Sequence, residues 1–188
     1  MLTDRFDDAF GFAASAHRSQ SRKVSGVPYI AHLMSVSALT LEYGGDEDCA
    51  IAALLHDAVE DQGGMAMAET IGARFGSRVR GIVLECSDRT SNNDNAPWRT
   101  RKERYIAQIM TKSDDAILVT SCDKLHNASS IVADMDVLGT RVFDRFRGKR
   151  DGTLWYYRAL ADALSTRAPG PLNTRLSAVV SHLEAASR

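Results

Sequence analysis

Several features that mark special classes of protein are absent from this 188-residue chain. It has no CxxC pair, and its three cysteines stand apart in helix-like contexts, so we expect reduced thiols in a cytoplasmic protein rather than a disulfide framework. It has no apolar run as long as a membrane span, and its start lacks the basic and apolar regions of a signal peptide, so we expect no membrane association. The net charge of −1 gives no general attraction for nucleic acid.

The composition that remains is that of an ordinary globular protein. Hydrophobic residues make up 44% and charged residues 25% of the chain, which excludes the disordered and fibrous classes. No fixed-period repeat and no low-complexity tract is visible. The length suits one domain with a substantial core, so we predict a single domain over residues 1–188.

Apolar residues recur at helical spacing along nearly the whole chain, and strand-like alternation never lasts more than a few residues. The pattern predicts an all-α bundle of about eight to ten helices. The expected helices begin after the N-cap Thr3 and run to about 19, then cover about 28–43, 47–61, 66–74, 77–87, 98–111, 114–133, 137–146, 153–166 and 172–186. The turn-rich stretch 87–97 predicts a loop.

The stretch AALLHDAVED, residues 52–61, is apolar enough for a buried helix but carries four polar residues. His56 and Glu60, like Asp57 and Asp61, are four residues apart, so a helix would place all four side chains in one patch. Burying carboxylates without partners is costly. Taken alone, this helix is also compatible with a solvent-facing patch.

Two further stretches repeat the anomaly. CDKLHN, residues 122–127, places Asp123 and Asn127 one turn apart on another apolar helix, and PYIAHLMSV places His32 on a third. A single buried histidine is usually a packing residue, but three such helices are better explained together. A divalent metal would neutralise the buried negative charge. The sequence therefore predicts a metal site formed by His32, His56, Asp57 and Asp123.

The order H…HD…D is the signature of the HD-domain metal phosphohydrolases, which are all-helical. Four segments, AHRSQSRKVSGVPYIAHLMSV, AALLHDAVED, FG and CDKLHN, follow the order and spacing of one branch of that family. The chain resembles the hydrolase domain of the bifunctional RelA/SpoT-type alarmone enzymes, and it is similar in size to the small stand-alone alarmone hydrolases of the SpoT-homologue group. The resemblance covers about residues 5–165 and implies an HD-domain bundle. The last expected helix, at about 172–186, lies outside it and is interpreted as a packing element.

The resemblance implies a Mn²⁺-dependent enzyme, with other divalent metals as alternatives. Its substrate would be a small nucleotide: the family removes the 3′-pyrophosphate of ppGpp and pppGpp, which yields GDP or GTP and pyrophosphate. The implied metal ligands are His32, His56, Asp57 and Asp123. The implied acidic catalytic pair is Glu60 and Asp61, and the implied substrate-binding residues are Arg22, Lys23, Asn127 and Ser130.

The chemistry of these residue types suits those roles. Glu60 and Asp61 can orient or deprotonate the attacking water and deliver a proton to the leaving group. Arg22 offers a flat surface for a purine, and Lys23 offers a point charge for phosphate. Asn127 follows Asp123 by one turn and so faces the same side of its helix. His17 is interpreted as a packing or supporting residue rather than a ligand.

The chain also departs from the family pattern at positions that bear on substrate choice. Gln62 stands where a Thr or Ser often follows the acidic pair, residues 128–130 lack an Arg found in many relatives, and segment 88–104 differs from the bifunctional enzymes. Two alternatives therefore stay open: an HD phosphohydrolase for another nucleotide such as (pp)pApp or NADPH, and a non-catalytic nucleotide sensor. A cyclic-dinucleotide phosphodiesterase of the HD-GYP type is disfavoured because the chain has no GYP tripeptide.

Two basic segments, 99–104 and 141–150, have two interpretations each. Each is either a solvated helix face or a rim that attracts the phosphates of the substrate. The clusters are short and the net charge of the chain is near zero, so they do not indicate a nucleic-acid surface.

Overall fold

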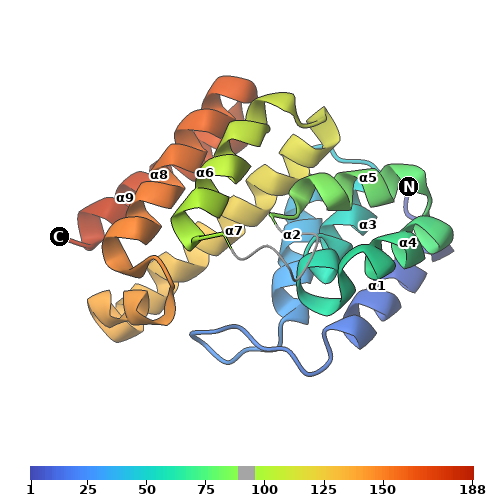
Figure 1. Cartoon of the computed structure of the whole chain (residues 1–188), viewed down its shortest axis with the longest axis horizontal. Coiled ribbons are helices and arrows are strands. Elements are labelled where there is room, and N and C mark those ends of the chain that lie inside the picture. The colour runs from blue at the N-terminus through green and yellow to red at the C-terminus, as the bar shows by residue number, and fades with distance from the viewer. Residues whose placement is uncertain (89–95) are drawn as a thin grey trace. The chain divides into compact units, whose positions relative to one another are not determined.

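The computed structural model describes residues 1–88 and 96–188, and these residues form nine α-helices together with short π- and 3₁₀-helical segments (Figure 1). The helices are α1 (Asp4–Ala16), α2 (Ile30–Glu42), α3 (Glu47–Leu55), α4 (Gly64–Phe75), α5 (Ser77–Cys86), α6 (Trp98–Gln108), α7 (Asp114–Leu138), α8 (Lys149–Arg167) and α9 (Pro171–Ala186). Within the described residues the only β-type pairing is an isolated bridge between Ser21 and Pro28, so the all-α prediction is confirmed. Most of the predicted 87–97 loop lies outside the described residues.

The chain divides into two compact units. Unit 1 consists of Met1–Arg22, the described residues of Val27–Asn95, and Lys112–Cys122. Unit 2 consists of Lys23–Gly26, Ala96–Thr111 and Asp123–Arg188. The division falls inside α7, between Cys122 and Asp123, and the single domain over residues 1–188 stays a prediction.

Helix α3 forms the centre of unit 1. All seven residues from Cys49 to Leu55 are buried, and the helix packs against α1, α2 and α5. Burying one leucine side chain stabilises a fold by about 1.5–3 kcal/mol, so this short helix contributes heavily to the core. Its start is fixed by Asp46, whose side chain accepts a hydrogen bond of 3.0 Å from the Cys49 amide.

The turn before α3 depends on glycine. Helix α2 ends at Glu42, and Gly44 follows with φ of 89°, a left-handed conformation that glycine adopts without strain. At Gly45 a Cβ atom would lie 2.7 Å from Cγ2 of Thr40, so only glycine lets the chain pass that close to α2. The α2–α3 hairpin results, and it brings the C-terminal end of α3 back beside the start of α2.

The predicted helix over 47–61 is shorter in the structure. Its α-helical part ends at Leu55, His56 and Asp57 form a turn, and a π-helical segment, η1 (Val59–Gly63), follows. The first helix also ends earlier than predicted, at Ala16 rather than about 19, although Thr3 caps its start by accepting from the Arg5 amide. At the end of α3 a side chain of the site bonds to the helix, because Nδ1 of His56 lies 2.8 Å from the Ala53 carbonyl oxygen.

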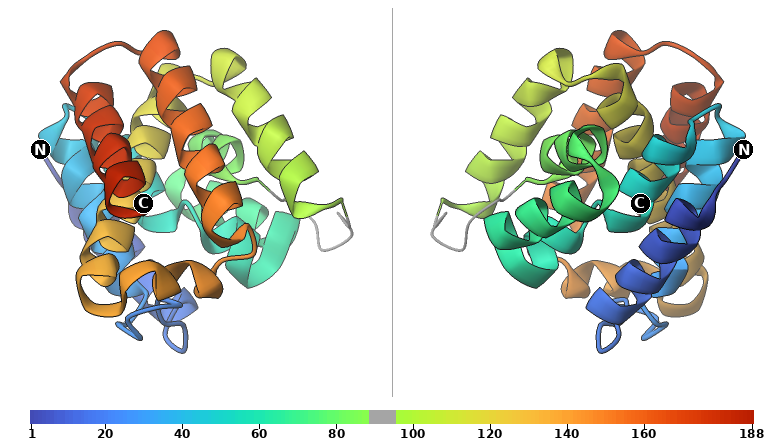
Figure 2. Two further views of the ribbon diagram at one scale, coloured as in Figure 1. Left: turned by 90° about the vertical axis from the view of Figure 1, so that its left-hand side faces the viewer. Right: turned by 90° about the vertical axis from the view of Figure 1, so that its right-hand side faces the viewer.

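Unit 2 contains α6, α8, α9 and the part of α7 from Asp123 onward. Helices α8 and α9 run side by side in opposite directions, joined by the short turn before Pro171 (Figure 2). Trp98 of α6 packs against Trp155 and Tyr156 of α8. A Cβ atom at Gly148 would lie 2.6 Å from Cη2 of Trp98, so this glycine admits the indole ring.

Four predicted ranges in this part of the chain change, and the first is α8, which begins at Lys149 rather than at about 153. Helix α7 continues to Leu138, five residues beyond the predicted end, and the predicted 137–146 helix is the 3₁₀ segment η3 (Gly139–Arg145). The predicted 98–111 helix is α6 followed by a 3₁₀ turn, η2 (Ile109–Thr111). The final helix matches its predicted range to within one residue at its start, with Pro171 in its first turn.

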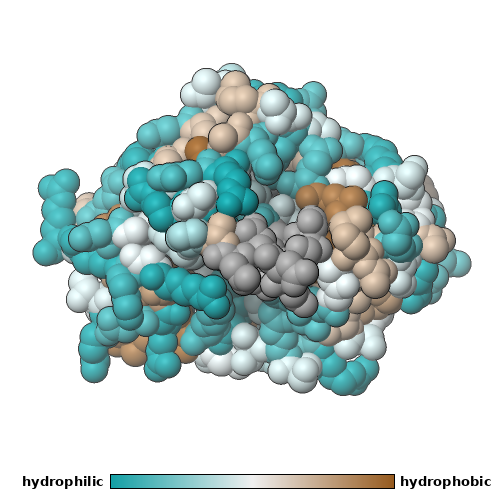
Figure 3. Space-filling view, in the orientation of Figure 1, coloured by the Kyte–Doolittle hydropathy of each residue, from teal (hydrophilic) through white to brown (hydrophobic). Residues whose placement is uncertain are grey.

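The described helices include none that is both long enough and apolar enough to cross a bilayer. On the face drawn in Figure 3, hydrophilic residues predominate and hydrophobic ones form small separate patches.

Candidate metal centre

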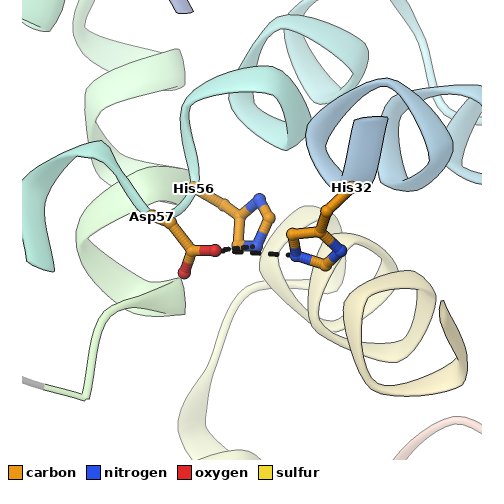
Figure 4. A group of neighbouring side chains, drawn as sticks. All are labelled: His32, His56 and Asp57. Carbon is orange, nitrogen blue, oxygen red and sulfur yellow. Dashed lines mark ion pairs between the residues drawn. The ribbon is translucent and has the colours of Figure 1, made fainter. Parts of the chain in front are cut away.

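Three of the four predicted metal ligands lie together in unit 1 (Figure 4). His32 comes from α2, His56 caps the end of α3, and Asp57 follows directly. One donor atom from each lies within 4.8 Å of the others. Nε2 of His56 is 3.0 Å and Nε2 of His32 is 3.6 Å from Oδ2 of Asp57. The histidines are buried, whereas 23% of the Asp57 side chain is exposed, so the cluster opens to solvent on its carboxylate side.

The end of α3 fixes the orientation of His56. The last carbonyls of a helix have no partner within the helix, and here Nδ1 of His56 donates to the Ala53 carbonyl at 2.8 Å. A proton on Nδ1 leaves Nε2 as the unprotonated nitrogen of the neutral ring, and that nitrogen is the one near Asp57. The same bond therefore satisfies a helix terminus and presents a metal-binding lone pair.

The π-helical segment η1 gives the acidic pair two separate environments. Oδ2 of Asp61 accepts a hydrogen bond of 2.7 Å from Nε2 of Gln20, and Oε2 of Glu60 accepts one of 3.3 Å from the Asp88 amide. The prediction of a single continuous α-helical face for His56, Asp57, Glu60 and Asp61 is therefore wrong. Short π-helical segments are frequent at functional sites, where they redirect side chains out of the regular helical register.

Tyr29 was not predicted as a site residue, yet it contacts the cluster directly. Its hydroxyl donates to Oδ2 of Asp57 at 2.6 Å. Its ring lies edge-on to His32, with 5.4 Å between centroids, and is stacked on His17 at 5.3 Å. Tyr29 precedes His32 by three residues at the start of α2, so helical spacing was the signal that could have identified it.

Of the predicted substrate-binding residues, Arg22 lies in unit 1 near the cluster. Its guanidinium carbon is 5.8 Å from the centre of the Tyr29 ring. Its sequence neighbour Lys23 belongs to unit 2. The backbone around Arg22 is fixed by its amide, which donates to the Val27 carbonyl at 2.8 Å in the small hairpin closed by Pro28.

Asp123, the fourth predicted ligand, belongs to unit 2 with Asn127 and Ser130. Asp123 is buried, with 7% of its side chain exposed, and its carboxylate accepts from Nδ2 of Asn127 at 2.5 Å and from Nζ of Lys124 at 2.6 Å. Burial is the largest single effect and would lower the pKa of Lys124. The Asp123 charge, Tyr156, Tyr105 and the hydrogen bond to Asp123 together outweigh it and raise that pKa well above its ordinary value. The Ser130 hydroxyl donates to the His126 carbonyl at 2.9 Å. The roles of these three predicted residues stay predictions.

The residues of the cluster fit a divalent metal. Two ligands bound to one ion at about 2.1 Å and at roughly a right angle lie about 3 Å apart, and wider angles separate them further. Oδ2 of Asp57 lies 3.0 and 3.6 Å from the two imidazole nitrogens. These distances agree with one ligand–metal–ligand angle of about 90° and one wider angle. Mixed imidazole and carboxylate donors suit first-row divalent ions such as manganese, iron or zinc.

Comparison with known proteins gives a consistent set of relatives. The family model for the HD domain matches residues 9–154. A probable guanosine-3′,5′-bis(diphosphate) 3′-pyrophosphohydrolase of Synechocystis sp. is 35% identical over 127 residues, which make up 66% of this chain and 16% of the relative. The guanosine-3′,5′-bis(diphosphate) 3′-pyrophosphohydrolase of Haemophilus influenzae is 32% identical over 158 residues, or 81% of this chain and 21% of the relative. The chain thus spans about a fifth of the length of the curated relatives it matches.

Two solved structures are also similar. A metazoan orthologue of SpoT, described as hydrolysing ppGpp, aligns with a TM-score of 0.78 and 26% identity over 97% of both chains. The protein lmo0812 of Listeria monocytogenes aligns with a TM-score of 0.69 and 26% identity over 80% of this chain and 97% of its own.

Proposed function

The chain belongs to the HD-domain family, and from that premise we propose that it is a phosphohydrolase that removes the 3′-pyrophosphate of the guanosine alarmones ppGpp and pppGpp. The observation that carries the proposal is the buried His32–His56–Asp57 cluster, with the acidic pair of η1 directly after it. The names of the relatives support the same substrate class.

We propose Mn²⁺ as the working metal, held by His32, His56, Asp57 and Asp123. When bound, such an ion polarises a phosphoryl oxygen and lowers the pKa of water. The two imidazoles are neutral donors, so the two carboxylates balance the charge of a divalent ion. That balance explains why the carboxylates are tolerated in largely buried surroundings.

In the proposed reaction Glu60 and Asp61 handle protons. Water attacks the phosphorus of the 3′-pyrophosphate, and the bond between that phosphorus and the ribose 3′-oxygen breaks. One carboxylate accepts a proton from the water, and the 3′-oxygen gains a proton as it leaves. The products are GDP or GTP with a free 3′-hydroxyl, together with pyrophosphate, so the atoms balance with one water consumed.

We propose that Arg22, Lys23, Asn127 and Ser130 bind the nucleotide. Support for Arg22 comes from its position over Tyr29, whose hydroxyl bonds to Asp57. A guanidinium plane can lie against a purine, whereas the Lys23 ammonium suits phosphate. The oxygens of Asn127 and Ser130 can accept hydrogen bonds from the ribose or the base. The three cysteines are free thiols, in keeping with the cytoplasm as the proposed compartment.

The test is a turnover assay of the purified chain with Mn²⁺ and with ppGpp, pppGpp and pppApp in parallel, in which pyrophosphate is quantified. We expect release from the two guanosine alarmones. Glu60→Gln should lower kcat by about 10²–10⁴-fold, the usual contribution of a general acid or base. The matched control is Glu69→Gln on α4, an exposed glutamate that pairs with Arg80, and it should keep full activity.

Each other outcome of this assay has a defined meaning. Turnover confined to pppApp, or phosphate release from NADPH in a parallel assay, would replace the guanosine substrate with another nucleotide. Tight binding of ppGpp without pyrophosphate release in Mn²⁺ would make the chain a nucleotide sensor. Full activity in Asp57→Ala would refute the metal assignment.

A further inference from the structure

We propose that Gln20 is a positioning residue for Asp61, and that Gln62 and His17 hold Gln20 in the orientation this role requires. The inference rests on the proposed function, because it matters only if Asp61 handles a proton during hydrolysis. All four residues belong to unit 1.

The contacts form one connected chain of hydrogen bonds. Nε2 of Gln20 donates to Oδ2 of Asp61 at 2.7 Å. Oε1 of Gln20 accepts from Nε2 of Gln62 at 2.6 Å and from Nδ1 of His17 at 2.7 Å. Gln20 is thus bonded at both ends of its amide, and its single direct contact with the acidic pair is to Asp61.

The orientation of the Gln20 amide follows from these partners. The oxygen and nitrogen of an amide are similar in shape, so only the hydrogen-bond network distinguishes them. A flipped Gln20 would point its oxygen at a carboxylate and its NH₂ group at the NH₂ group of Gln62, and both contacts are repulsive. The network therefore directs an N–H group at Asp61.

His17 gives the network a rigid anchor. The ring is 2% exposed and stacked on Tyr29 with 20° between the planes, so it cannot move independently of the core. Asp61, in contrast, is exposed on a five-residue π-helical segment. The Gln20 bond holds Oδ2 of Asp61 at 2.7 Å from an amide that is itself anchored through His17. A fixed carboxylate orientation is the condition for efficient proton transfer.

Gln62 gives the Gln20 oxygen its second partner, because Nε2 of Gln62 donates to it at 2.6 Å. The hydroxyl oxygen of Thr or Ser stands at the γ position, two bonds short of the Nε2 atom that reaches Gln20. A hydroxyl side chain at position 62 would lose this bond and leave the Gln20 oxygen with His17 as its partner.

The experiment compares Gln20→Met and Gln62→Thr with wild type, using steady-state kinetics on ppGpp with Mn²⁺. We expect Gln20→Met to lower kcat by about 10–100-fold while KM changes less than about threefold, because the variant loses positioning rather than binding. We expect Gln62→Thr to lose less, about three- to tenfold, because the His17 bond remains. Gln108→Met, at the exposed end of α6, is the matched control and should match wild type.

Two further measurements separate positioning from a structural role. The double variant Gln20→Met/Asp61→Asn should be no slower than Asp61→Asn alone, because Gln20 acts only through Asp61. In ¹⁵N spectra, the side-chain NH₂ resonances of Gln20 should shift in Asp61→Asn and in Gln62→Thr but not in Gln108→Met. Gln62 is exposed, so its variant keeps the test informative if Gln20→Met fails to fold.

The possible failures are distinguishable. If the wild-type chain hydrolyses ppGpp and the kcat of Gln20→Met is within twofold of the wild-type kcat, this inference is overturned and the proposed function stays intact. Additive losses in the double variant, or Gln20 resonances unchanged in Asp61→Asn, would overturn it as well. A wild-type chain without turnover would overturn the proposed function and this inference together.

Discussion

Replacing Tyr29 with Phe tests how the metal cluster is held together. The substitution removes the hydroxyl that donates to Oδ2 of Asp57 at 2.6 Å and leaves the aromatic ring in place. The ring keeps its stacking on His17 and its edge contact with His32, so the fold of unit 1 should be unaffected. The variant therefore isolates a single hydrogen bond to a proposed metal ligand.

The expected magnitude follows from the charge and exposure of Asp57. A hydrogen bond to a charged group contributes about 1.5–3 kcal/mol. Because 23% of the Asp57 side chain is exposed, water partly replaces the lost hydroxyl, and the low end of that range applies. About 1.5 kcal/mol corresponds to about a tenfold rise in the Kd for Mn²⁺. The nearby bond from His56 to the Ala53 carbonyl is unchanged, so binding should be weakened but not abolished.

The assay is a calorimetric titration of the metal-free protein with Mn²⁺ at pH 7.5. Tyr43→Phe is the matched control, because Tyr43 lies at the opposite end of α2 from Tyr29. We expect the control to bind like wild type and Tyr29→Phe to bind about tenfold more weakly, with melting temperatures of the metal-free proteins unchanged. Equal Mn²⁺ affinity in Tyr29→Phe and wild type would refute the view that this hydroxyl orients Asp57.

Three other measurements follow from the structure. Chelation with EDTA should abolish pyrophosphate release. Added Mn²⁺ should restore the release in wild type but not in Asp57→Ala. Activity that survives chelation would contradict a metal mechanism. Burial, followed by hydrogen bonding to Asp46, raises the pKa of Cys49 to about 12, so iodoacetamide at pH 8 should modify this thiol only after unfolding, as mass spectrometry can show. Hydrogen bonds from Arg158 lower the pKa of Glu184. The ion pair therefore stabilises the fold fully when the pH is above the ordinary glutamate pKa of about 4.3. This stabilisation is lost as the pH falls through the lowered pKa of Glu184. Both side chains are one-third exposed, so the effect is small. Glu184→Gln should lower the melting temperature by about 1–3 °C at pH 7 and by less at pH 2.5, and an equal loss at both pH values would contradict the ion pair.

The helical architecture was predictable because its signals are local. Thr3 as N-cap, Gly44 after α2 and Pro171 at the start of α9 mark helix ends through properties of single residues. The longer α7 has tertiary support, because Met135 lies beyond the predicted end, is buried, and accepts a hydrogen bond of 3.8 Å from the Ser187 hydroxyl. The 3₁₀ segment η3 follows α7, and its residues Gly139, Thr140 and Val142 are weak α-helix formers.

The site shows the same division between local and tertiary signals. The pattern of histidine and aspartate in apolar surroundings identified His32, His56 and Asp57, because buried charge is rare enough to stand out. The same argument could not identify Tyr29 or Gln20. Tyrosine and glutamine carry no net charge and do not stand out in this way. Helical spacing relative to His32 was a signal for Tyr29, but the fold was needed to show that the polar atoms of Tyr29 and Gln20 face Asp57 and Asp61.

The break at the end of α3 explains how an HD dipeptide supplies two ligands to one ion. Adjacent residues in a regular α-helix point about 100° apart and do not face each other. Because the α-helix ends at Leu55, the two side chains turn toward a common point, and Nε2 of His56 lies 3.0 Å from Oδ2 of Asp57. The Ala53 carbonyl that the break leaves without a helical partner is used to orient His56. A continuous helix would have satisfied that carbonyl with a backbone amide and would have separated the two ligands. The irregular backbone is therefore a requirement of the site, and the apolar helix before it supplies the packing energy that holds the irregular segment in place.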